Sequence, residues 1–184
     1  MVQCPDAFTP EQKHDNFVYY ERVTVRDSSL SPGTLAVMAA ETGHMELAYD
    51  YLCESAQMDL ADLEHNVRDG VHLAALGSAW TAIVMGLGGM RTHDGGLSFA
   101  PRLPEAVSGL RFRIQWRGRS VHIAVEGAEV TYTLESGEDL ELGHHGEQVT
   151  VSTDQPVTLD VPPPPNVGPV EQPPGRAPLF RRHS

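Results

Sequence analysis

The sequence predicts an α+β chain in three parts: a helical part over residues 1–92, a small antiparallel β domain over residues 93–161 and a tail over residues 162–184. Apolar residues recur at helical spacing in the first part, and they alternate with polar residues in the second. The β domain is therefore expected to be a sandwich or jelly-roll piece. The tail is rich in proline with few apolar residues, which is typical of disorder.

Capping residues delimit the first two predicted helices. The first is expected over residues 10–21, with Thr9 as its N-cap, and the second over residues 32–42, with Ser31 as its N-cap. Both have proline at the first helical position, where the missing N–H has no intrahelical partner. Gly43 is the expected stop of the second helix.

Two further helices are predicted over residues 45–58 and 71–87, with Asp69 as a candidate cap for the latter. Apolar residues cover most of the circumference of the last helix. It is therefore predicted to be buried nearly all round, with Trp80 in the core.

Two strictly alternating runs, 110–117 and 120–126, flank Gly118-Arg119 and predict a β-hairpin. His144-His145 lies between glycines and predicts a solvated turn rather than a metal site, because no acidic or cysteine ligand stands at suitable spacing. The remaining predicted strands are short: 97–99, 130–134, 140–142, 149–151 and 157–161.

Composition limits the class of protein. The chain has 184 residues and a net charge of −12, which argues against nucleic acid or an acidic membrane surface as a partner. The two cysteines, Cys4 and Cys53, form neither a disulfide framework nor a metal-binding pattern, so a reducing, cytoplasmic compartment is expected. Neither a signal peptide in residues 1–10 nor a membrane-spanning segment is expected.

Polar residues stand before two of the predicted helices, in segments 28–32 and 69–72. The unpaired amides at a helix N-terminus attract anions, and neighbouring hydroxyl groups add donors. In an up-and-down array, the second and fourth helices begin at the same end. Ser28, Ser29 and His72 would then line one rim and form a candidate phosphate site.

Plainer interpretations stay open on the residues alone. The serines can simply cap a helix, and a histidine in the first turn of a buried helix is commonly structural. Four carboxylates are candidates for acid–base chemistry, but no spacing pairs any two of them. They are Glu21, Asp27, Glu41 and Asp69.

Four segments, 19–32, 39–43, 69–72 and 88–91, resemble the C-terminal part of glycoside hydrolase family 65. The resemblance covers roughly residues 6–135. The family includes maltose, trehalose and kojibiose phosphorylases and some hydrolases. The paired serines, followed later by Gly-x-His, are the most specific part of the match.

The resemblance implies a fold and a mechanism. The family fold is an (α/α)6 barrel followed by a β-sandwich domain, so this chain would hold the C-terminal section of the barrel. In the phosphorylases, inorganic phosphate attacks the anomeric carbon with inversion, and no other cofactor is needed. Ser28, Ser29 and His72 match the residues that hold the phosphate. No catalytic residue is assigned here, because the family's general acid glutamate is expected upstream of these motifs.

Three departures accompany the resemblance: Arg26 stands where histidine is usual, Asp69 where glutamate is common, and Ser78 where threonine is usual. The expected partners are an α-glucosyl disaccharide and phosphate in the complete enzyme, together with an N-terminal barrel half. By itself the chain is expected to be inactive. The alternatives are a non-catalytic remnant, a split-gene subunit that needs such a partner, or a carbohydrate-binding β module.

Overall fold

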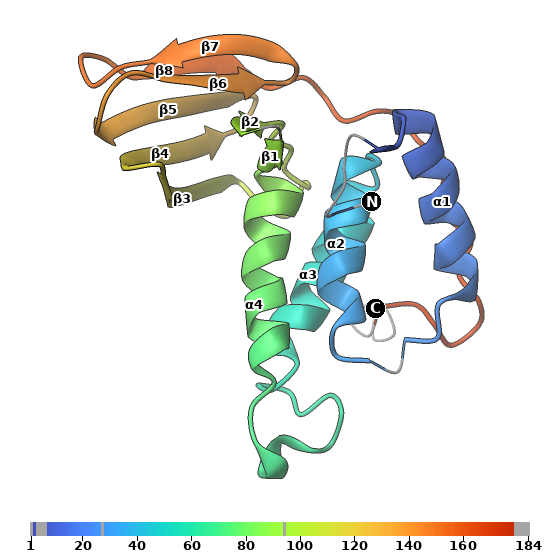
Figure 1. Ribbon diagram of the computed structural model, residues 1–184. Helices are drawn as coiled ribbons and strands as arrows, with labels where there is room; N and C mark the ends of the chain where they lie inside the picture. The colour runs from blue at the N-terminus through green and yellow to red at the C-terminus, as the bar shows by residue number, and fades with distance from the viewer. Residues whose placement is uncertain (1, 3–6, 27, 94, 179–184) are drawn as a thin grey trace. The chain divides into compact units, whose positions relative to one another are not determined.

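The computed structural model forms two compact units, one mainly helical and one made of β-strands (Figure 1). The β unit comprises Gly88–Pro164, and the helical unit contains the described residues before and after it. No described helix is long and apolar enough to cross a membrane. Cys53 is a free thiol, whereas Cys4 lies outside the described residues. The structure describes residues 2, 7–26, 28–93 and 95–178.

The helical unit is an up-and-down array, as predicted. The chain alternates in direction from each helix to the next, so α2 and α4 begin at the same end (Figure 1). A short 3₁₀ turn, η2, precedes α4, and a π-helical segment, η3, continues it. The elements are α1 (Pro10–Val23), α2 (Ser31–Glu41), α3 (Met45–Gln57), η2 (Val67–Asp69), α4 (Leu73–Thr81) and η3 (Ala82–Leu87).

Two helix ends follow the prediction and one does not. Thr9 forms a capping box with Gln12, accepting from its backbone N–H at 3.2 Å and donating its own N–H to the Gln12 side chain at 2.9 Å. Gly43 ends α2 with a φ of 91°. Ser31 is not the N-cap of α2 but its first helical residue, and its N–H donates to the Ser28 carbonyl. The cap position therefore falls on Leu30.

The prediction of an all-round buried fourth helix is wrong. In α4 only Ala75 is buried, and Leu73, Leu76 and Trp80 are 75%, 47% and 54% exposed. The described residues supply packing partners for one side of α4 only, so its apolar circumference is left half covered. Asp69 does not cap α4 either, because it lies in η2 and the N-cap position belongs to His72.

The buried side of α4 approaches α2 closely through a glycine. A Cβ on Gly33 would lie 2.3 Å from the Cβ of Ser78, which no side chain tolerates. Because Gly33 has no side chain, the backbone of α2 packs directly against the Ser78 side chain of α4. Most of α2 is buried as a result, including the run Leu35–Ala40.

The β unit contains two four-stranded sheets, whose buried side chains form one core. The predicted hairpin is confirmed, with β3 and β4 paired so that Ile114 lies opposite Val121. Its turn lies one residue earlier than predicted, at Arg117 and Gly118, which both have positive φ. One pair, β2–β6, is parallel, and the first strand, β1, was not predicted. The first sheet contains β1 (Arg91–His93), β2 (Gly96–Phe99), β6 (Leu140–His144) and β7 (Glu147–Val151), and the second contains β3 (Gly109–Trp116), β4 (Arg119–Glu126), β5 (Glu129–Ser136) and β8 (Val157–Asp160).

His144 is buried and links the two sheets, so the prediction of a solvated turn is wrong for it. Its Nε2 donates to the Asp160 carbonyl at 2.9 Å, which leaves Nδ1 to accept the Tyr132 hydroxyl at 2.9 Å. Burial raises the pKa of Tyr132, which keeps its hydroxyl a donor. Only His145 and Gly146, both with positive φ, turn the chain between β6 and β7. Among the described residues, no group of histidine, cysteine, aspartate and glutamate has a metal-binding arrangement.

The proline-rich segment differs from the disordered tail that its composition predicts. Residues 165–178 form neither helix nor strand, but the side chains of Gln172 and Arg176 hydrogen-bond to the helical unit. A turn closed by the Arg176 N–H and the Pro173 carbonyl at 3.0 Å, with Gly175 at a φ of 77°, lies between them. Contacts made by two polar side chains leave no periodic signal in a sequence.

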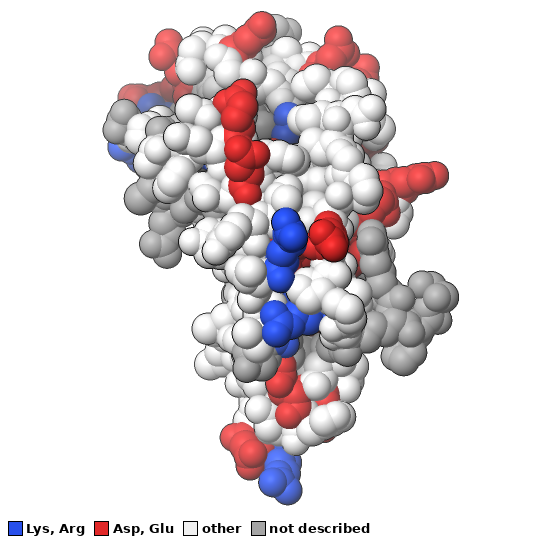
Figure 2. Space-filling view, turned by 90° about the vertical axis from the view of Figure 1, so that its right-hand side faces the viewer, with Lys and Arg blue, Asp and Glu red and all other residues white. Residues whose placement is uncertain are grey.

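Acidic side chains are scattered over the face shown in Figure 2, and basic side chains form only small groups among them. This distribution agrees with the net charge of −12. Any anion site on this chain must therefore rely on local donors rather than on a broad positive field.

His145 makes the β unit sensitive to acid. Desolvation, followed by the neighbouring charges of His144 and Arg102, lowers the pKa of His145 from 6.5 to about 4. Between these values the unfolded chain binds a proton that the folded chain does not, so stability falls as the pH drops from about 6.5 to about 4. We expect His145→Asn, which tolerates positive φ, to flatten this part of the pH dependence of the thermal midpoint.

Comparison at pH 8, where His145 is neutral in both states, separates any packing effect of the substitution. Equal pH slopes for the variant and the parent chain would show that His145 does not titrate in this window.

Candidate functional site

The residues predicted to bind an anion lie at the N-terminal ends of α2 and α4. Both helices begin at the same end of the helical unit (Figure 1), and neither has a side-chain cap. Leu30 has no polar side chain, and the His72 side chain makes no capping hydrogen bond. No side chain therefore accepts from the first-turn amides at either end, although the N–H groups of Ser31, Leu73 and Ala75 donate to backbone carbonyls.

The two serines form the turn that leads into α2. Ser28 is exposed, and its hydroxyl oxygen accepts the Leu30 N–H at 3.4 Å, while its carbonyl accepts the Ser31 N–H at 3.2 Å. Ser29 is half-buried in the same turn. A hollow of about 330 Å³ adjoins this turn, lined by Thr24, Leu30, Ser31, Thr34 and Leu35.

His72 is held by Asp59, a residue to which no role was assigned from the sequence. The ring Nδ1 lies 2.5 Å from one carboxylate oxygen of Asp59, and the backbone N–H of His72 donates to the other at 2.9 Å. The hydrogen bond from His72 is the largest cause of a lowered pKa at Asp59. An ionised carboxylate only accepts, so Nδ1 carries a proton and Nε2 is the nitrogen left for a ligand.

The serines and His72 share one end of the unit without touching. Gly33, in the first turn of α2, packs against Ser78, five residues into α4. The start of α4 therefore lies about 7 Å beyond that level along the helix axis, at 1.5 Å per residue. Among the described residues, neither Ser28 nor Ser29 forms a hydrogen bond with His72.

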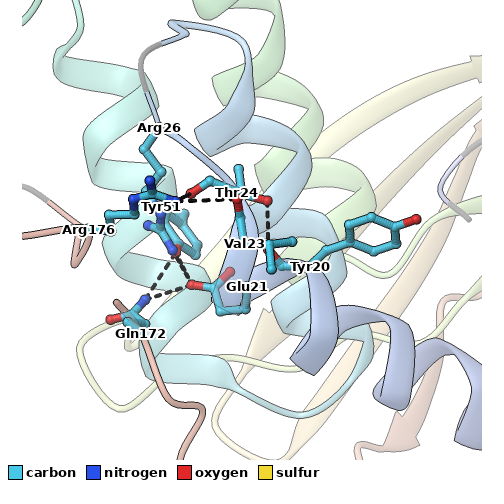
Figure 3. A network of polar contacts seen from close by, with 8 residues as sticks. All are labelled: Tyr20, Glu21, Val23, Thr24, Arg26, Tyr51, Gln172 and Arg176. Carbon is cyan, nitrogen blue, oxygen red and sulfur yellow. Dashed lines mark hydrogen bonds and ion pairs between the residues drawn. The ribbon is translucent and has the colours of Figure 1, made fainter. Parts of the chain in front are cut away.

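Arg26, which precedes the serine turn, belongs to a buried polar network (Figure 3). Its guanidinium pairs with the fully buried carboxylate of Glu21 and lies 4.6 Å from the ring centroid of Tyr51. The Tyr51 hydroxyl donates to the same Glu21 oxygen. Burial and the negative charge of Glu21 raise the pKa of Tyr51, so it remains a donor.

This network decides the role of the candidate acid–base residue Glu21. Its carboxylate is fully buried and bound by an arginine and a tyrosine, so it is unavailable to a substrate at the surface. The network is not fully satisfied: Glu21 Oε2 and the Nε and Nη1 atoms of Arg26 are buried without a hydrogen-bond partner. Arg26 therefore faces a structural carboxylate instead of extending the anion rim.

Two family models match the chain. Residues 1–81 match the glycosyl hydrolase family 65 central catalytic domain, and residues 90–151 match the glycosyl hydrolase family 65, C-terminal domain. The two matches fall on the helical unit and on the β unit, respectively.

Curated relatives agree with this assignment. An uncharacterized glycosyl hydrolase of Mycobacterium leprae is 53% identical over 180 residues, which is 96% of this chain and 23% of that protein. The maltose phosphorylase of Bacillus subtilis is 38% identical over 79% of this chain and 19% of its own length. The α,α-trehalose phosphorylase of Thermoanaerobacter brockii is 37% identical over 78% of this chain and 19% of its own.

A solved structure shares the fold. It is that of a protein assigned as a kojibiose phosphorylase, from the human microbiome, with a TM-score of 0.81 and 24% identity over 87% of this chain and 23% of that one. The chain thus spans less than a quarter of the length of the proteins that it matches. Its two units carry matches to two consecutive domains of one family, and the chain belongs to glycosyl hydrolase family 65.

Proposed function

We propose that this chain is the phosphate-binding part of a family 65 α-glucoside phosphorylase. Ser28, Ser29 and His72 would hold inorganic phosphate, which is the co-substrate, and no other cofactor is required. Acting alone, the chain would bind phosphate without cleaving a sugar.

One observation carries this proposal: two parallel helices begin at the same end without side-chain caps. Each helix N-terminus carries roughly half a positive charge, in a chain whose overall charge is strongly negative. The serine hydroxyls and His72 Nε2 add polar groups around these two ends. Counted from the Gly33–Ser78 contact at 1.5 Å per residue, α4 begins about 4–5 Å beyond the start of α2. One anion can span this difference in level, directly or through water.

The proposed chemistry is inverting phosphorolysis of an α-glucosyl disaccharide such as maltose, trehalose or kojibiose. Phosphate attacks the anomeric carbon, so a protein carboxylate is not needed to activate water. One general acid must still protonate the leaving oxygen, and we place this glutamate in a part of the catalytic domain that precedes the matched region.

Hydrolysis is the alternative reaction in this family, and it needs a carboxylate base at the same place. Asp59 is the carboxylate nearest to His72, but both of its oxygens are engaged by this histidine. Asp59 therefore acts as an anchor rather than as a base. This engagement favours phosphorolysis over hydrolysis.

An exposed apolar stripe on α4, formed by Leu73, Leu76 and Trp80, indicates that this helix packs against further parts of the catalytic domain. We propose that these side chains pack against preceding helices of an (α/α)6 barrel, supplied by a longer chain or by a separate subunit. A stripe of three large apolar side chains is costly to leave in water. A non-catalytic remnant under no selection to bind the missing half would not need to keep it.

Phosphate is expected to raise the thermal midpoint of the purified chain. At a concentration ten times the dissociation constant, a ligand of the folded state adds about 1.4 kcal/mol, or about 3–5 °C for a chain of this size. Ser29→Ala and His72→Ala should each remove most of this shift. Differential scanning calorimetry in phosphate, against chloride at equal ionic strength, measures it.

Thr153→Ala, at an exposed position of the β unit, is the matched control and should retain the full shift. A folded chain whose midpoint stays constant up to about 50 mM phosphate, which is ten times a dissociation constant on the order of 5 mM, would contradict the phosphate assignment.

The apolar stripe predicts self-association of the isolated chain. We expect sedimentation velocity to show concentration-dependent oligomers, and the double substitution Leu76→Lys, Trp80→Lys to give monomers, because charges on the stripe oppose its burial. Thr153→Lys adds charge elsewhere and should leave the oligomers unchanged. If the parent chain is monomeric at every concentration, the stripe is not an interface.

A further inference from the structure

After the β unit the chain returns to the helical unit. Residues 165–178, named here the strap, belong to the helical unit although the whole β unit separates them from α4 in sequence. A hollow of about 340 Å³ remains beside the strap, lined by residues 43–47 on one side and by residues 167–170 and Gln172 on the other. Elsewhere the strap packs closely: a Cβ on Gly43 would lie 3.1 Å from the Pro165 carbonyl oxygen. Two of its polar side chains also hydrogen-bond to the helical unit.

The first attachment is Gln172. Its side-chain amide donates to Glu21 Oε1 at 2.7 Å and to the Tyr51 hydroxyl oxygen at 3.1 Å (Figure 3). These partners lie on α1 and α3, so one amide group joins the strap to both helices. Hydrogen bonds to a buried charge are the stronger ones, because the charge cannot turn to water instead.

The second attachment is Arg176. Its Nη1 donates to the Thr24 carbonyl at 3.1 Å and to the Val23 carbonyl at 3.3 Å. These carbonyls belong to the last residue of α1 and to its C-cap, where backbone acceptors have no partner within the helix. The Pro173–Arg176 turn aims Arg176 at them.

Both attachments lie on the residues that lead into the serine turn. Glu21 holds Arg26, Arg176 holds Thr24, and Ser28 follows two residues after Arg26. We propose that Gln172 and Arg176 of the strap are positioning residues that set the conformation of the chain entering the Ser28–Ser29 turn. The effect on phosphate binding rests on the function proposed above, whereas the effect on the turn itself does not.

The incomplete hydrogen bonding of the network makes it depend on Gln172. Glu21 Oε2 and two nitrogens of Arg26 are already without partners, and all the bonds that Glu21 receives converge on Oε1. Removing the Gln172 amide takes away one of three donors to a carboxylate with no access to solvent. The Glu21–Arg26 pair must then rearrange, and Arg26 is continuous with the turn.

The test replaces Gln172 by its charged isostere. In Gln172→Glu a carboxylate oxygen replaces the amide nitrogen that lies 2.7 Å from Glu21 Oε1. Because the two negative charges repel each other, we expect the strap to detach at pH 7. Amide hydrogen exchange at Thr24, Leu30 and Ser31 should then accelerate about tenfold, since these amides donate within and beside the turn. Arg176→Ala should accelerate the Thr24 amide by a similar factor.

Asn166→Asp is the matched control, because it adds the same charge at an exposed position of the strap. It should leave exchange unchanged. Lowering the pH to about 5 should restore protection in Gln172→Glu, where the carboxylate facing Glu21, Arg26 and Tyr51 takes up a proton, but not in Arg176→Ala. The Ala48 amide in α3, bonded to the His44 carbonyl, reports global unfolding and should stay protected.

The outcomes separate the two proposals. Unchanged exchange at Thr24, Leu30 and Ser31 in both variants overturns the positioning role. Faster exchange in the variants, together with no effect of inorganic phosphate on the parent chain, keeps the positioning role and contradicts the phosphate site. Faster exchange with about tenfold weaker phosphate binding supports both. If Gln172→Glu does not fold, Arg176→Ala decides alone.

Discussion

The helical unit depends on the burial of one charge, the carboxylate of Glu21. A carboxylate fully removed from water must be met by donors, and Glu21 receives them from Arg26, Tyr51 and Gln172. These donors come from the segment after α1, from α3 and from the strap, so three parts of the chain are fixed by one atom. The segment from α1 to α2, which carries the serines, is joined to this network through Arg26.

The β unit also buries a polar side chain, the imidazole of His144, but this group is neutral. His144 uses both ring nitrogens, one as a donor to the Asp160 carbonyl and one as an acceptor from Tyr132. A neutral imidazole can do this only in one tautomer, so the link also fixes the relative position of the two sheets. The adjacent half-buried His145, whose pKa is depressed to about 4, stays neutral near neutral pH. Each unit thus has a polar cross-link that is stable near neutral pH.

Local signals predicted much of this fold. Thr9, Gly43 and the Gly118 hairpin act through backbone chemistry within a few residues, and the structure confirms them. Contacts between distant residues left no such signal. Asp59 holds His72 across 13 positions, Gln172 reaches Glu21 across 151, and β2 pairs with β6 in parallel. Glycines beside His144 indicated a turn, whereas its burial depends on strands that pairing alone brings together. The anion-binding roles of Ser28, Ser29 and His72 remain predictions.

The fourth helix shows a limit of hydrophobic patterning: the pattern predicts burial, but it does not identify the partner that provides it. Its apolar circumference predicts burial, and this inference is correct about the chemistry of the side chains, yet Leu73, Leu76 and Trp80 lie in solvent. The pattern specifies that a surface is to be covered but not which chain covers it. Gly33 and Ser78 show that the covered side was built for close packing. One side of this helix is packed to contact distance and the other is apolar and bare, which is the arrangement that the proposed packing against further helices requires. The matched relatives, more than four times as long as this chain, have the length to supply the rest of one.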